Sequence, residues 1–226
     1  MSFKDIFNID AEVKESAHAR VNLIGEHTDY TGGYVMPTLL SFKNTIEITE
    51  NITNEFIVYS QHFKEKKAFN DFKKSSDNEW VDYIKGCLHI FFEENKISSK
   101  CLNIYISSDI PLERGISSSS ALCVATLKAL NTFFETKIKD PEIAKLAKKV
   151  EFNYIGVSGG IMDQMVSSIG IHGKAFFMNC KNLEYELINF PENWKFCLID
   201  SEVQRNLRDS SYNERFAELQ EAEKKL

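Results

Sequence analysis

Two carboxylates and an imidazole stand at the end of an apolar segment in ARVNLIGEHTDY, residues 19–30. The strand-like alternation stops at Gly25, which releases the chain from extended geometry, so Glu26, His27 and Asp29 are expected to line a cavity at the strand end. Carboxylates accept hydrogen bonds from vicinal hydroxyls, and a hydrogen bond to a charged group contributes about 1.5–3 kcal/mol. This pattern suits the selection of one sugar epimer. A solvated surface turn is the simpler alternative.

A serine cluster follows a glycine in PLERGISSSSA, residues 111–121. Gly115 permits a tight turn, and the helix predicted to follow presents unpaired N–H groups and the positive end of its dipole. The dipole alone contributes about 0.3–1 kcal/mol, so N–H and hydroxyl donors must supply most of any phosphate affinity. Neither the P-loop nor the dinucleotide-binding spacing is present. The segment indicates a phosphate site of another architecture or, more simply, an ordinary loop with a serine cap.

A third group combines Glu151 with GGIMDQ, residues 159–164. Adjacent glycines permit another molecule to approach the backbone closely. Asp163 follows an apolar pair, so packing is expected to hold its carboxylate in place as a proton acceptor. The alternative is that Asp163 caps the short helix that follows.

The elements that position these groups are predicted from hydrophobic periodicity. Helical spacing begins at Trp80, with Asp77 or Asn78 as the N-cap, and returns after Asp140 as cap and Pro141 as first helical residue. Further helices are predicted at 121–134, 162–168 and 210–226, and strands at 20–24, 34–40, 45–49, 55–59, 101–107, 175–178, 183–188 and 195–200, with a brief edge strand in 68–72. Strands first and helices later, without regular alternation, predict an α+β fold.

Composition narrows the classes of partner. Acidic residues outnumber basic ones by 33 to 27, giving a net charge of −6, and no dense Lys and Arg cluster is present, which argues against nucleic acid. No apolar run approaches the roughly 18 residues that span a bilayer, and the N-terminus lacks a signal-peptide pattern. Five cysteines in no metal or redox spacing are expected to be reduced core residues. We therefore expect no membrane partner and a cytoplasmic location.

Taken together, these segments resemble a known family. ARVNLIGEHTDYTGGYVMP resembles the signature of galactokinases, and GISSSSA resembles the nucleotide loop of the galactokinase, homoserine kinase, mevalonate kinase and phosphomevalonate kinase superfamily. GGIMDQ resembles the superfamily segment that carries the catalytic aspartate, and RNLRDSSYNE, residues 205–214, resembles the segment whose tyrosine lies near the sugar.

The resemblance implies a two-domain kinase fold with a ribosomal protein S5-like N-terminal domain. Residues 1–176 would form that domain, and residues 177–226 would be the incomplete start of the C-terminal domain. The superfamily's third, glycine-rich motif is missing, so we expect either a fragment of a longer kinase or a product that has lost function. Strands left unpaired after residue 176 would expose apolar surface, which predicts self-association.

The resemblance also implies roles for single residues, with ATP and Mg²⁺ as cofactors. Asp163 would accept the proton of the galactose C1 hydroxyl, and Arg20 would lie between that hydroxyl and the γ-phosphate. The remaining roles are sugar binding by Glu26, His27, Asp29, Gly160 and Tyr212, phosphate binding by Gly115, Ser117, Ser118, Ser119 and Ser120, and Mg²⁺ contact by Ser119 and Glu151.

Two alternatives to a galactokinase stay open. The first is a non-catalytic sensor of galactose or ATP that binds a partner protein, since the family fold has been reused for regulation. The second keeps the enzyme and changes the sugar, because kinases for N-acetylgalactosamine and arabinose have similar signatures.

Overall fold

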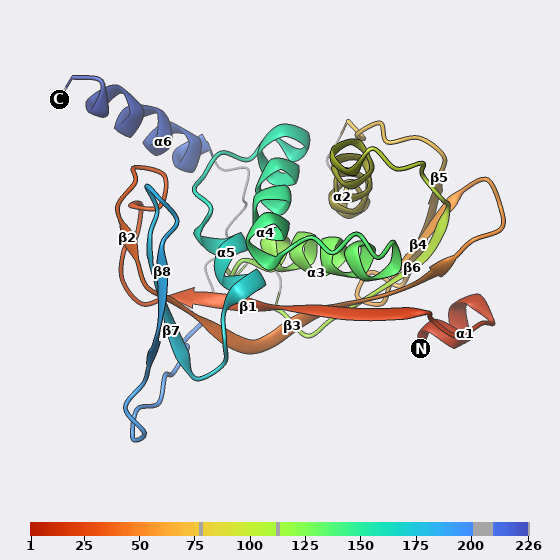
Figure 1. The fold of residues 1–226 in the computed structure, drawn as a ribbon, viewed down its shortest axis with the longest axis horizontal. Coiled ribbons are helices and arrows are strands. Elements are labelled where there is room, and N and C mark those ends of the chain that lie inside the picture. The colour runs from red at the N-terminus through yellow and green to blue at the C-terminus, as the bar shows by residue number, and fades with distance from the viewer. Residues whose placement is uncertain (77–78, 112–113, 201–209, 226) are drawn as a thin grey trace.

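The computed structural model describes residues 1–76, 79–111, 114–200 and 210–225, with the side chains of 210–213 and 223 left aside. Within these residues, eight strands form one sheet, and the helices α2, α3, α4 and α5 cover one of its faces (Figure 1). The strand order is β2-β7-β3-β6-β4-β5, with β1 paired to β3 and β8 paired to β7. The predicted α+β class is confirmed.

The elements have the following bounds. The strands are β1 (Val13–Asn22), β2 (Tyr34–Val35), β3 (Pro37–Glu50), β4 (Phe56–Ser60), β5 (Glu65–Phe69), β6 (Leu102–Ser108), β7 (Lys174–Asn179) and β8 (Tyr185–Asn189). The helices are α1 (Phe3–Phe7), α2 (Trp80–Asn95), α3 (Ser118–Phe133), α4 (Asp140–Lys149), the π-helix η1 (Val150–Ile155), α5 (Met162–Ile169) and α6 (Ser210–Glu223).

The sheet is mixed, although most of its pairs are antiparallel. Strands β4 and β6 run parallel, because β5 and α2 intervene between them and supply the crossover that parallel neighbours require. The predicted strands 34–40 and 45–49 are a short β2 and one long β3. The predicted strand at 195–200 is wrong, since none of these residues lies in a strand.

Helix starts also differ from the predictions. Helix α3 begins at Ser118, three residues earlier than expected, so three serines form its first turn. The N-cap of α4 is Lys139, and Asp140 is already helical. The N-cap of α2 is Glu79, and the predicted caps at 77 and 78 lie outside the described residues. The helix predicted to begin at Pro141 changes to π-helical geometry at Val150.

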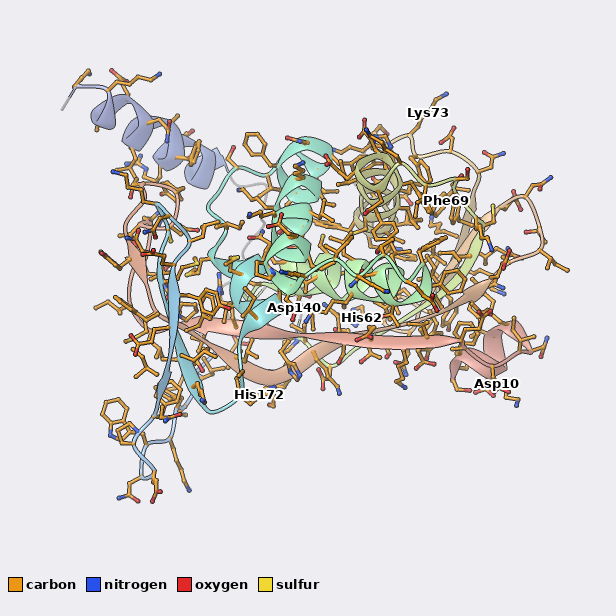
Figure 2. The ribbon with its side chains drawn as sticks, in the orientation of Figure 1. Asp10, His62, Phe69, Lys73, Asp140 and His172 are labelled. Carbon is orange, nitrogen blue, oxygen red and sulfur yellow. The ribbon has the colours of Figure 1, made fainter. Side chains whose placement is uncertain are left out.

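The main core lies between the helices and the sheet, where side chains fill the space between the two layers (Figure 2). Phe91 of α2, Leu127 of α3 and Ile46 of β3 are fully buried there. A second cluster seats α5 on β7 through Met165, Val166 and Phe176. Because α5 also packs against α3 and α4, the residues at its start are held in place.

Residues after 176 continue the same sheet. Strand β7 runs across the predicted boundary at 176, and β8 pairs with it from Lys174 to Met178, so the division into 1–176 and 177–226 stays a prediction. Beyond β8, apolar side chains are exposed, including Trp194 at 63% and Ile199 at 87%. The self-association expected from such surface is untested.

All five cysteines are free thiols, but only Cys87 and Cys123 are buried, and Cys197 is exposed. The described helices include none with the length and apolar character needed to cross a bilayer.

Candidate active site

A two-contact ion pair joins β1 to α5. Arg20 Nε lies 2.7 Å from Asp163 Oδ1, and Arg20 Nη2 lies 2.7 Å from Asp163 Oδ2. The third donor, Nη1, reaches the carbonyl of Gly115 at 2.9 Å. The strand register shifts between His18 and Arg20, and the N–H of Arg20 donates instead to the carbonyl of Ile116 at 3.2 Å. A bulge of this kind redirects a side chain, and here it aims the guanidinium at the serine segment.

The serine segment turns back onto the same aspartate. Gly115 adopts a left-handed φ of 70°, which confirms the predicted turn, and Ser117 adopts φ 62° as the residue before α3. The hydroxyl of Ser117 donates to Asp163 Oδ2. Asp163 therefore accepts hydrogen bonds from Arg20 and Ser117, and the N-cap of α5 is Ile161 instead.

Below this turn lies a buried group that we call the serine network, consisting of Ser119, Ser120, Glu151 and Gln164. Ser119 and Ser120 each donate to one carboxylate oxygen of Glu151 at 2.7 Å, and the Gln164 amide donates to the same carboxylate. Glu151 is 6% exposed and lies in the π-helix, a geometry frequent at functional sites. Burial raises the pKa of Glu151, and the three donors act against that rise. Ser120 thus faces inward and is not presented at the loop surface.

The resemblance implies that Ser119 and Glu151 contact Mg²⁺, and both residues belong to the serine network. Ser119 Oγ and Glu151 Oε1 are hard oxygen donors in direct contact, and Mg²⁺ is usually held by one or two carboxylates together with phosphate oxygens and waters. The pair fits as part of such a ligand set. In the described part of the chain, no group of three or more acidic, histidine or cysteine side chains is placed to hold a metal.

The loop of residues 25–33 is closed by a threonine. Thr28 Oγ1 contacts the carbonyls of Gly25 at 2.8 Å and Tyr34 at 2.7 Å. A side chain at Gly25 would place its Cβ 2.4 Å from the Tyr34 oxygen, so only glycine fits there. The two hydrogen-bond contacts of Thr28 hold the two ends of the 25–33 loop together.

The predicted hydroxyl-binding groups lie on that loop. Glu26 and His27 are exposed. Glu26 accepts from Asn22 Nδ2 at 3.0 Å, and His27 Nδ1 lies 2.5 Å from the Tyr30 hydroxyl. His27 adopts a left-handed φ of 61°, which costs a non-glycine residue roughly 1–2 kcal/mol. Such a conformation persists where the surrounding structure enforces it, often at ligand sites.

Asp29 connects the 25–33 loop to the glycine pair before α5. Its carboxylate rests on Gly160, where an added Cβ would lie 2.0 Å from Asp29 Oδ2. Burial, together with the nearby charge of Asp163, raises the pKa of Asp29 to about 6. The structure therefore brings Asp29, Gly160, Asp163 and Arg20 together. The side chain of Tyr212 lies outside the described residues.

Three residues of this region were not predicted. Gln164 holds Glu151, and its own Oε1 is buried without a partner. Asn22 supports Glu26, and its Oδ1 is likewise buried and unpaired. Lys148 donates to the carbonyl of Gly159. The available signals were position alone, since Gln164 adjoins Asp163 and Lys148 precedes Glu151 by three residues, about one helical turn.

Comparisons with known proteins agree with this geometry. The family model "GHMP kinases N terminal domain" matches residues 82–170, and "Galactokinase galactose-binding signature" matches residues 1–49. A galactokinase of Thermococcus kodakarensis is 37% identical over 90% of this chain and 57% of its own length. The chain thus spans a little over half the length of the curated relatives it matches.

Solved structures give the same result. The galactokinase of Lactococcus lactis in complex with galactose superposes with a TM-score of 0.87 at 31% identity, covering 97% of this chain and 58% of that one. A mevalonate kinase of Methanococcus jannaschii shares the fold, with a TM-score of 0.67 at 23% identity over 79% of this chain and 56% of that one. Over nine tenths of its length the chain is thus similar to galactokinases, and two separate segments match the GHMP kinase N-terminal model and the galactose-binding signature.

Proposed function

We propose that the protein transfers the γ-phosphate of ATP to the C1 hydroxyl of galactose, giving galactose 1-phosphate. The observation that carries this proposal is the Arg20–Asp163 pair, which joins the predicted sugar acceptor to the serine turn through 2.7 Å contacts and through Gly115. The galactokinase relatives and the galactose-bound structure from Lactococcus lactis support it.

Asp163 acts as acceptor for the C1 proton. Phosphoryl transfer passes through a loose transition state in which the nucleophile is little bonded, so the proton leaves late and a carboxylate of ordinary basicity suffices. Arg20 orients Asp163 with two donors, and its positive charge offsets charge that develops on the transferring oxygens. Its third contact, to Gly115, fixes that charge beside the phosphate loop.

The first turn of α3 binds the phosphates. Backbone N–H groups at this helix start and the hydroxyl of Ser118 are the donors, and Gly115 shapes the turn. Ser117 and Ser119 line the same turn with their oxygens, while their hydroxyl protons go to Asp163 and Glu151. Ser120 supports them from below through Glu151. Ser119 and Glu151 would hold Mg²⁺, which, when bound, supplies positive charge to the phosphate oxygens.

Galactose binds over the 25–33 loop. Glu26 and Asp29 accept from its hydroxyls, His27 donates or accepts, and Gly160 leaves room for close approach. We place Tyr212 in the same site on the resemblance alone. The protein acts in the cytoplasm, where ATP is available and where the five free cysteines stay reduced.

A non-catalytic galactose or ATP sensor is the second candidate, and a kinase for N-acetylgalactosamine or arabinose is the third. A coupled assay of ADP release, run with and without galactose, separates the first two. The kinase releases ADP only with the sugar, whereas a sensor binds both ligands by calorimetry and releases none. The same assay across the three sugars identifies the substrate.

A further inference from the structure

One partly buried cation of the site has no part in the reaction described above. Lys148 lies in the last turn of α4, and its ammonium donates to the carbonyl of Gly159 and lies 5.4 Å from the centroid of the Phe152 ring. The other lysines of this helix lie on the surface, where Lys145 pairs with Glu142 and Lys149 pairs with Glu94. Lys148 alone among the three turns toward the site.

The backbone that Lys148 holds is the seat of Asp29. Gly159 and Gly160 form the turn before α5, and the Asp29 carboxylate rests against the Cα of Gly160. Because a Cβ at Gly160 would overlap that carboxylate, a small displacement of the turn moves Asp29. A hydrogen bond from an ammonium to the neighbouring carbonyl restricts such displacement.

Asp29 also needs a counter-charge. Its neighbours include a second carboxylate, Asp163, and the cations Lys148 and Arg20. Arg20 has donors on both oxygens of Asp163 and on Gly115. Lys148 is thus the main cation that balances Asp29. Burial lowers the pKa of Lys148, and the charges of Glu151, Asp29 and Asp163 act against that fall and favour its protonated form.

Two more titratable groups face Asp29. Burial raises the pKa of Tyr30, and the charge of Asp29 adds to that rise. Burial, together with the charge of Asp29, raises the pKa of the Cys180 thiol to about 12. Both groups are uncharged near neutral pH, so neither supplies a counter-charge.

We propose that Lys148 is a positioning residue for Asp29: it holds the Gly159–Gly160 turn on which Asp29 rests and provides more positive charge to Asp29 than Arg20, which is bonded to Asp163. This role in sugar binding rests on the proposed function. The effect on Asp29 itself does not, because it belongs to the unliganded protein.

The test compares Lys148→Met with Lys149→Met, a matched removal of the adjacent surface lysine, and with Lys148→Arg, which keeps the charge. The ionisation midpoint of Asp29 is measured by NMR of aspartate-labelled protein. Loss of a close counter-charge should raise the midpoint by about one pH unit in Lys148→Met. Lys149→Met should leave the Asp29 midpoint unchanged. Lys148→Arg, which keeps the charge, should keep the midpoint close to that of the parent protein. Galactose affinity at pH 7 should fall about tenfold in Lys148→Met alone.

Each result has a definite reading. If the Asp29 midpoint of Lys148→Met equals that of Lys149→Met, the inference is overturned. If the parent protein binds no galactose, the proposed function fails, and the Asp29 midpoint still decides the role of Lys148. If Lys148→Met unfolds, the polar but uncharged Lys148→Gln replaces it: an Asp29 midpoint raised by about one unit supports the inference, and an unchanged midpoint overturns it.

Discussion

The two ends of the site are built in different ways. In the serine network, Glu151 and Gln164 are 6% and 5% exposed, and every carboxylate oxygen of Glu151 has a donor. On the 25–33 loop, Glu26 and His27 are exposed, and their contacts lie at the surface. The phosphate end is therefore fixed before any ligand arrives, whereas the sugar end keeps its polar groups in water.

This difference follows what each end has to do. Dipoles and donors fixed in advance stabilise developing charge without reorganisation during the reaction, which favours burial at the phosphate end. Hydroxyl recognition works by exchange, because each sugar hydroxyl replaces a water on an exposed acceptor. Asp29 and Asp163 connect the ends, and both are partly buried.

The largest effect is expected where the two ends meet. Replacing Asp163 by Asn removes the proton acceptor and keeps its shape, so turnover should fall by about 10²–10⁴-fold. Sugar affinity, measured by calorimetry, should change little, since Asp29 and the 25–33 loop remain. Asp10→Asn, at an exposed ion pair with Lys4, is the control and should leave turnover unchanged. A loss of less than about tenfold, roughly 1.4 kcal/mol, would show that Asp163 is not the acceptor.

The serine network is tested by Glu151→Ala. The change leaves Ser119, Ser120 and Gln164 without their shared acceptor, and unpaired buried donors should lower the free energy of unfolding by about 2–4 kcal/mol. Urea denaturation measures this. Glu94→Ala removes a glutamate that pairs with Lys149 at the surface, and it should cost less than about 1 kcal/mol. Equal losses of unfolding free energy in Glu151→Ala and Glu94→Ala would show that the serine network is not stabilised by its buried hydrogen bonds.

The sequence was informative about the fold wherever periodicity decides. Helix α2, which begins at Trp80, and helix α5 are amphipathic. The apolar residues of the β6 segment alternate in sequence and predict a strand, although both faces of β6 are buried from Leu102 to Ile106. Residues 196–199 form a continuous apolar run, but such a run only predicts burial, and a strand also needs a neighbour to pair with. The π-helix and the bulge before Arg20 leave no pattern in composition, because tertiary contacts determine both.

The sequence predicted which residues belong to the candidate site better than it predicted which atoms they contact. The meeting of Arg20 and Asp163, 143 positions apart, agrees with the roles that the resemblance implied. The hydroxyl of Ser117 was expected on phosphate, yet it contacts Asp163. Lys148 was missed, because a lysine on a predicted amphipathic helix usually faces solvent. Its direction depends on where Gly159 lies, and local sequence does not contain that information.

Asp29 sharpens the comparison, because it belongs to the exposed end yet is partly buried. Its folded-state pKa of about 6 exceeds the value of about 3.9 in an unfolded chain, so the folded state holds the proton more tightly. The associated stability is full below about pH 4 and is lost as pH rises through 6. Asp29→Asn should therefore be more stable than the parent by about 2 kcal/mol at pH 8, with no difference near pH 4.

Thermal or urea unfolding across this pH range measures the difference, and galactose affinity should fall in the same variant. Glu26→Gln, at an exposed position of the same loop, is the matched control and should show no such pH-dependent gain. A stability difference that stays constant from pH 4 to pH 8 would mean that Asp29 is not held protonated by burial.

The smallest effect is expected at the surface of the 25–33 loop. Tyr30→Phe removes the hydroxyl that lies 2.5 Å from His27 Nδ1; this contact lies at the surface, where water can replace it. The loss in unfolding free energy should be below about 1 kcal/mol, measured by urea denaturation beside Glu151→Ala. Because His27 holds a left-handed backbone, galactose affinity should still fall several-fold when its ring is released. If Tyr30→Phe destabilised the protein as much as Glu151→Ala, the sugar end would be as rigidly built as the phosphate end, and the contrast between them would not hold.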